Sequence, residues 1–91
     1  MSTQEQVQIK EKQDVKSEES SQIVLWNDEV NTFDHVIESL VDICDHTYIQ
    51  AEQCSLIVHY NGKCTVKTGD RSKLVPQCSA LLDAGLSAEL I

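Results

Sequence analysis

The sequence of 91 residues has no long run of apolar residues, and this absence argues against two kinds of segment. A secretory signal needs at least about 7 consecutive apolar residues behind a basic start, and a membrane-spanning helix needs about 20. Neither pattern is found along the chain. We therefore expect a cytoplasmic protein that does not enter a membrane.

Basic residues are also scarce, with 7 Lys and Arg against 15 Asp and Glu, giving a net charge of −8. A surface this acidic repels phosphate groups, so nucleic acids and anionic membranes are poor partners. Basic groups on a partner protein suit it better. Acidity of this kind also serves simply to keep a domain soluble, so by itself it does not identify a partner.

Paired cysteines with metal-ligand spacing are missing. Cys44, Cys54, Cys64 and Cys78 are spaced 10, 10 and 14 residues apart, without a C-x-x-C pair. Each falls on an apolar stripe, which favours reduced thiols that pack as small hydrophobic side chains. A zinc site built from Cys44, His46 and two distant cysteines is the alternative, but the spacing does not favour it. We expect no cofactor.

Residues 1–21 contain no aromatic residue and no Leu. Their few apolar side chains cannot bury enough surface to offset the entropy lost on folding. We therefore predict a disordered N-terminal extension over residues 1–21 and a single folded domain over residues 22–91.

Apolar spacing in the rest of the chain predicts six elements. A strand at 22–26 is apolar on both faces, as expected in the middle of a small sheet. A helical stripe follows from Phe33 to Cys44, with Asn31 or Thr32 available to cap it. The capping box Thr47-x-x-Gln50 then starts a second helix, which Gly62 ends.

The C-terminal third of the chain supplies the other three elements. Cys64 and Val66 alternate with polar residues as in a strand. A third helix begins after Asp70 or Ser72, with Pro76 in its first turns. Its inward side chains are expected to be Leu74, Val75, Cys78, Leu81 and Leu82. A final strand spans 86–91.

The order β-α-α-β-α-β predicts an α+β fold, a two-layer sandwich whose three-stranded sheet is covered by helices on one face. A right-handed crossover through the third helix makes the last two strands parallel. The first strand then lies antiparallel between them.

Polar side chains occur in two places where the predicted fold does not require them. Asn27 and Asp28 directly follow the first strand, and His59 lies in the last turn of the second helix. If they converge, their oxygen and nitrogen acceptors suit a cation that donates three hydrogen bonds, such as a protonated α-amino group. The alternatives are turn chemistry for Asn27 and Asp28, and a bond from His59 to the last helix carbonyls.

Two strings resemble the ClpS family, the adaptors of the Clp ATP-dependent proteases. They are Ile23-Val-Leu-Trp-Asn-Asp-Glu-Val30 and Leu56-Ile-Val-His-Tyr-Asn-Gly-Lys63. Together with Ala51, they are similar to that family's strand ending in Asn-Asp-(Asp/Glu) and its helix ending in Val-His-x-x-Gly. The same element order also resembles the C-terminal domain of ribosomal stalk proteins.

The ClpS resemblance implies an adaptor that holds the free α-amino group and bulky hydrophobic side chain of N-degron substrates. It delivers them to the N-terminal domain of a ClpA- or ClpC-type AAA+ unfoldase, and we expect it to act as a monomer. By motif position, Asn27, Asp28 and His59 bind the amine. A side-chain pocket is implied to be lined by Phe33, Val36, Ser55, Val58 and Leu86, with Asn31 near the substrate backbone.

The chain departs from the family pattern at Phe33 and Ser55, where many members have methionine, so the accepted side chains remain open. Two other functions also stay open. An enzyme could use Asp28 or Glu29 with His59 as an acid–base pair, but the sequence lacks a nucleophile on a special turn and a phosphate loop, so we expect no enzyme. An interaction domain of the same fold would not read N-termini.

Overall fold

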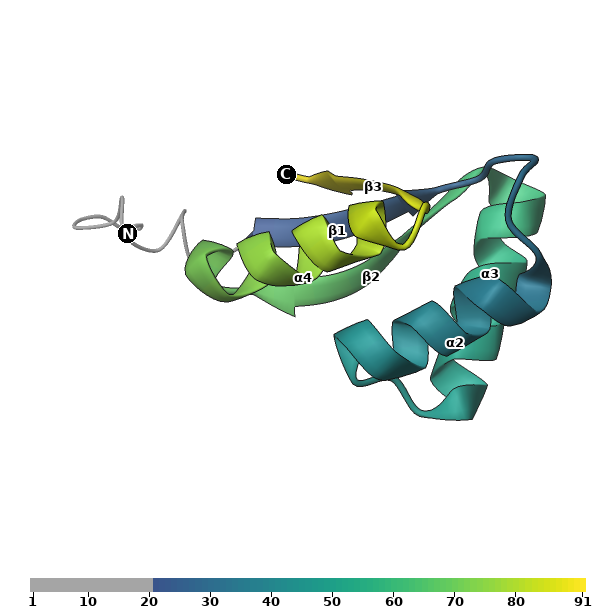
Figure 1. The fold of residues 1–91 in the computed structure, drawn as a ribbon, viewed down its shortest axis with the longest axis horizontal. Helices are drawn as coiled ribbons and strands as arrows, with labels where there is room; N and C mark the ends of the chain where they lie inside the picture. The colour runs from purple at the N-terminus through teal and green to yellow at the C-terminus, as the bar shows by residue number, and fades with distance from the viewer. Residues whose placement is uncertain (1–20) are drawn as a thin grey trace, which may run out of the picture.

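The computed structural model describes residues 21–91 and contains the six expected elements in the expected order (Figure 1). They are β1 (Ser21–Trp26), α2 (Phe33–Cys44), α3 (Tyr48–Asn61), β2 (Lys63–Gly69), α4 (Arg71–Asp83) and β3 (Ser87–Leu90). The extension predicted over residues 1–21 lies outside the described residues, except for Ser21. That residue begins β1 instead of preceding it.

β1 is the central strand of a three-stranded sheet of order β2-β1-β3. It pairs antiparallel with both neighbours, so β2 and β3 run parallel to each other, as predicted. Ile23 and Leu25 point into the core beneath the helices. On the opposite face, the Thr65 hydroxyl donates to Gln22 Oε1 at 3.0 Å. The α+β two-layer fold is thus confirmed.

The pairing of β1 with β2 contains a bulge that the sequence pattern does not predict. Ile23 pairs with Lys67 and Val24 with Thr65, which leaves Val66 as the extra residue. His46 lies beside this irregularity, with Nε2 2.7 Å from the Val66 carbonyl oxygen. Because a carbonyl only accepts, Nε2 carries the hydrogen and donates. The bulged strand is thereby tied to the loop between α2 and α3.

Local signals correctly predicted the start of α2 and both ends of α3. The Thr32 hydroxyl accepts from the backbone N–H of His35 at 3.1 Å. Thr47 and Gln50 form both bonds of the capping box, at 3.0 and 3.1 Å. Gly62 ends α3 with φ of 95°, a left-handed conformation that glycine adopts without a steric penalty. These contacts place His59 in the last turn of α3.

α4 begins after Asp70, one of the two predicted caps, but it differs from its prediction in its buried face. Asp70 makes no side-chain cap bond. Pro76 is the sixth helical residue, so one helical hydrogen bond is missing there. Leu74, Cys78 and Leu81 are buried, but Val75 and Leu82 are about half exposed. The apolar residues of α4 span two neighbouring stripes, and only one of them packs against the sheet.

The four cysteines are free thiols, as expected. Cys44 and Cys78 are buried, whereas Cys54 and Cys64 are only partly buried. Burial raises the pKa of Cys44 and Cys78, and burial together with the Cys64 thiol raises the pKa of Cys54 to about 12. No group of three or more potential metal ligands gathers within residues 21–91. Over the same range, no helix has the length and apolar character needed to cross a membrane.

Candidate functional site

A cavity of about 290 Å³ lies where the end of β1 meets α2, α3 and the start of β3. All nine residues that the sequence singled out line it, namely Asn27, Asp28, Asn31, Phe33, Val36, Ser55, Val58, His59 and Leu86. They come from four separate stretches of the chain. The structure therefore brings the predicted site residues together, while their roles in binding remain a prediction.

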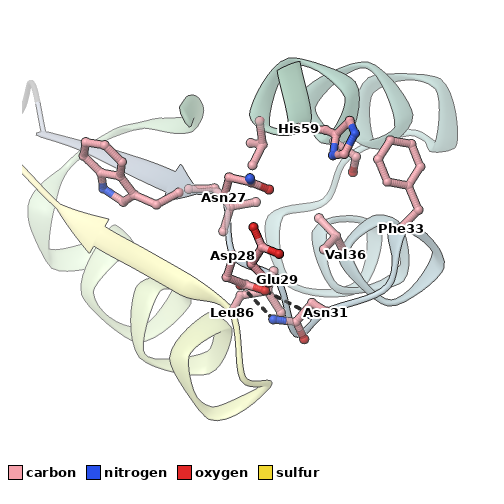
Figure 2. A pocket seen from close by; sticks show the side chains of 12 residues that line it. Asn27, Asp28, Glu29, Asn31, Phe33, Val36, His59 and Leu86 are labelled. Atoms are coloured by element: carbon pink, nitrogen blue, oxygen red, sulfur yellow. Dashed lines mark hydrogen bonds between the residues drawn. The ribbon is translucent and has the colours of Figure 1, made fainter. Parts of the chain in front are cut away.

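The loop after β1 and the end of α3 lie on opposite sides of this cavity (Figure 2). Asn27 and Asp28 project from the loop, and His59 and Phe33 lie across from them. The backbone N–H of Asn27 donates to the Gly62 carbonyl at 2.9 Å, which joins the loop to the turn that ends α3. This bond holds Asn27 and His59 at the same end of the molecule.

Asp28 organises the loop through both carboxylate oxygens. Oδ1 accepts from the backbone N–H groups of Val30 and Asn31, each at 2.9 Å. Oδ2 accepts from the side-chain amide of Asn31 at 2.9 Å and from the Ser87 hydroxyl at 3.4 Å. Asp28 therefore forms the side-chain turn that was one of the alternatives for this residue. The same residue also lines the cavity.

The same contacts set the charge of Asp28. Burial raises the pKa of its carboxyl, but the hydrogen bonds from Asn31, Val30 and Ser87 outweigh burial and the pKa is lowered overall. A lowered pKa means that folding favours the ionised form. The contribution of Asp28 to folding stability is present above the pKa that its carboxyl has in the unfolded chain. That contribution is lost as pH falls through the lower pKa of the folded state. Asp28 is thus an anion at neutral pH.

His59 forms no ring hydrogen bond within residues 21–91, whereas each of the other two histidines uses Nε2 and His46 leaves only Nδ1 without a partner. His35 and His46 each place Nε2 within 2.8 Å of a backbone carbonyl oxygen. Within residues 21–91, neither ring nitrogen of His59 forms a hydrogen bond, so it does not cap the helix carbonyls. Its ring instead meets Phe33 edge to face, with centroids 5.9 Å apart, and contacts Tyr60 at 4.9 Å. A free acceptor nitrogen is therefore available beside the cavity.

The deeper wall of the cavity is apolar. Val58 and Leu86 are buried, and Val36 is partly buried beside the core. Ser55 is only 3 % exposed, and its hydroxyl donates to the Ala51 carbonyl at 2.8 Å, so its single donor is already used. Phe33 is 41 % exposed and forms part of the rim. This wall suits a hydrocarbon or aromatic side chain.

The cavity thus combines a carboxylate, an amide and an imidazole with an apolar recess. Its volume is near the lower end of the range for ligand pockets, which is typically about 300–1,000 Å³. A small group with a cationic end and an apolar end matches this arrangement.

Sequence reasoning did not assign two lining residues, Leu25 and Trp26, or the supporting contacts of Gly85 and Ser87. Leu25 and Trp26 were interpreted only as parts of a buried strand. Glu29, which directly follows Asn27 and Asp28, was named for the enzyme alternative, and it also lines the cavity. No pattern in the sequence indicated that Ser87, 59 positions further along, contacts Asp28.

Residues 16–89 match the sequence model of the family described as ATP-dependent Clp protease adaptor protein ClpS. No curated protein gives a significant match. The structure of Agrobacterium tumefaciens ClpS2 bound to L-phenylalaninamide is similar, with a TM-score of 0.73. The alignment covers 81% of this chain and 96% of that chain at 16% sequence identity. At this identity, the likeness to ClpS2 shows a shared fold.

Proposed function

The chain belongs to the ClpS family of adaptors of the ATP-dependent Clp protease, and we propose that it is an N-degron adaptor. In this proposal the protein binds the free α-amino group and bulky hydrophobic first side chain of a substrate. It then delivers the substrate to a Clp AAA+ unfoldase for degradation. The observation that carries the proposal is the meeting of Asn27, Asp28 and His59 beside an apolar cavity.

Each part of the site has a partner group on such a substrate. The anionic Asp28 attracts the ammonium group, and Asn27 and His59 offer acceptors for its hydrogens. Charge-assisted bonds of this kind contribute roughly 1.5–3 kcal/mol each. Burying a Phe or Leu side chain against Val58 and Leu86 contributes about 1.5–3 kcal/mol more, before ordering costs. L-Phenylalaninamide, the ligand of ClpS2, has the same two features, a free amine and a benzyl group.

The mechanism is binding and handover, without bond breaking, so the proposal includes no enzymatic activity and no cofactor. The partner we propose is the N-terminal domain of a ClpA- or ClpC-type unfoldase, with the adaptor acting as a cytoplasmic monomer. The segment that precedes β1 is proposed to engage the unfoldase. The competing proposal is an interaction domain that shares the fold but does not recognise N-termini.

Fluorescence anisotropy with a labelled peptide series tests this function directly. The peptides differ only in their first residue (Phe, Leu, Tyr, Trp, Ile, Val, Arg or Ala), and each has an N-acetylated twin. We expect Phe or Leu peptides to bind and acetylation to abolish binding, because acetylation removes the positive charge and two donor hydrogens. If acetylated twins bind equally well, or no peptide binds, the interaction-domain proposal replaces the adaptor.

Substitution of His59 tests its part in holding the amine. A neutral imidazole nitrogen accepts a hydrogen bond from an ammonium group, so His59→Ala should weaken the binding of a Phe peptide by roughly tenfold. His59→Asn keeps an acceptor and should recover part of that affinity. Equal affinities of His59→Ala and the unsubstituted protein, measured by anisotropy, would exclude His59 from the amine site.

A further inference from the structure

The carboxylate of Asp28 receives four hydrogen bonds, and Asn31 donates two of them. One comes from the Asn31 backbone and the other from its side-chain Nδ2, at 2.9 Å from Oδ2. Within residues 21–91, the other side-chain donor to Asp28 is the Ser87 hydroxyl, at the longer distance of 3.4 Å. The side-chain amide of Asn31 is therefore the shorter of the two side-chain contacts with Oδ2 of Asp28 (Figure 2).

The same nitrogen makes a second bond, to the Gly85 carbonyl oxygen at 2.9 Å. A side-chain amide has two N–H hydrogens, so these two acceptors use both of them. Gly85 has φ of 90° in the turn between α4 and β3, and it directly precedes Leu86 in the apolar wall. One amide group thus joins the carboxylate at the polar end of the cavity to the backbone that positions its apolar end.

We propose that Asn31 is a positioning residue, which holds the Asp28 carboxylate in place and fixes its position relative to Leu86. This inference rests on the proposed function, in which Asp28 meets the substrate amine and Leu86 its side chain. It assigns Asn31 an action through Asp28, where the family resemblance implied a position near the substrate backbone. Both N–H hydrogens of its amide are already engaged within the protein.

Two substitutions separate this role from a general effect on folding. Asn31→Ala removes the amide. Asn31→Asp keeps the size and shape but replaces both donor hydrogens with a carboxylate that repels Asp28. Gln53→Glu is the matched control, because it also converts an amide to a carboxylate but lies exposed on α3, away from the cavity lining. Glu29 and His59, the other ionisable residues of the cavity lining, are unchanged in all three variants.

The first measurement is the titration of the Asp28 carboxyl carbon by NMR, which needs no ligand. We expect the pKa of Asp28 to rise in Asn31→Ala and to rise further in Asn31→Asp, while Gln53→Glu leaves it unchanged. A loss of stability elsewhere in the protein would not move this signal, and the same spectra report whether each variant is folded. Unchanged titration of Asp28 in both folded Asn31 variants would overturn the proposal.

The second measurement is a double-mutant cycle, with a Phe peptide titrated by NMR so that weak binding remains measurable. Asn31→Ala should weaken binding roughly tenfold when Asp28 is present, a size typical of coupling between hydrogen-bonded residues. In an Asp28→Asn background, the same substitution should change affinity by less than about twofold. Equal losses in both backgrounds would mean that Asn31 acts on the peptide or the fold, against the proposal.

These two measurements also separate the inference from the function on which it rests. If the unsubstituted protein binds no peptide, the adaptor function fails, and the Asp28 titration still decides whether Asn31 positions the carboxylate. If peptides bind but the titration and the cycle show no coupling, the function stands and the positioning role is wrong.

Discussion

Asp28→Asn is expected to weaken the binding of a Phe peptide by roughly 10- to 100-fold, the factor that corresponds to losing one charge-assisted hydrogen bond. The substitution nearly preserves the size of the side chain, but it removes the negative charge that we propose attracts the ammonium group. It also replaces one carboxylate oxygen, an acceptor, with an NH2 group, a donor. Asn31 Nδ2, which donates to Asp28 Oδ2, could then face a second donor. The affinity of the free-amine peptide, measured by anisotropy, checks this result.

Asp42→Asn is the control for that experiment, since it removes the same charge from an exposed position on α2 outside the cavity. It should change affinity only slightly, because exposed charges at long range are screened by salt. If the two substitutions have equally small effects, the charge of Asp28 does not hold the amine. The remaining acceptors, Asn27 and His59, would then have to bind it without Asp28.

Leu40→Ala is expected to lower the free energy of unfolding by about 2–5 kcal/mol, through lost burial and the cavity left behind. Leu40 is 0 % exposed and lies in the core where α2 packs. A domain of this size has a total stability of only about 4–10 kcal/mol. The variant should therefore have a free energy of unfolding close to zero or only a few kcal/mol. Urea denaturation followed by circular dichroism would measure it.

Leu82→Ala is the control, because it is the same truncation at a half-exposed leucine. Leu82 is 52 % exposed on the outer stripe of α4, so its truncation should cost less than about 1 kcal/mol. Similar losses from the two variants would contradict the packing described for α2 and α4. The pair also separates loss of fold from loss of binding, because neither residue lines the cavity.

The sequence predicted best those features that depend on neighbouring residues. The capping box joins Thr47 to Gln50, three positions apart, and Gly62 needs only its own freedom at positive φ. The central position of β1 followed from apolar residues on both of its faces. Such signals are local, so the element order and the α+β fold could be predicted before any contact was known.

Contacts between distant residues could not be predicted in the same way. Alternation along β2 gives no sign of the bulge at Val66, because the bulge depends on its pairing with β1. The exposure of Val75 and Leu82 was missed because the apolar residues of α4 extend around more of the helix than the sheet can cover. Which stripe packs inward is decided by tertiary contacts.

The candidate site shows both cases. The family resemblance pointed to nine residues that line one cavity, and its two motifs lie where β1 and α3 end. The bond of Asn31 with Gly85 had no such signal, since Gly85 is 54 positions away from Asn31. The residues that line the cavity could thus be predicted, but not the long-range contacts that support them.

Trp26, the only tryptophan of the sequence, directly precedes Asn27 and also lines the cavity. Its indole N–H donates to Glu89 at 3.0 Å, and the Lys63 ammonium lies 5.1 Å from its ring centroid. Both partners lie on the strands that flank β1, so the indole environment depends on the sheet remaining assembled. The protein therefore contains a single tryptophan, and it lies next to the candidate site. Its emission can be followed without a label or background from a second tryptophan.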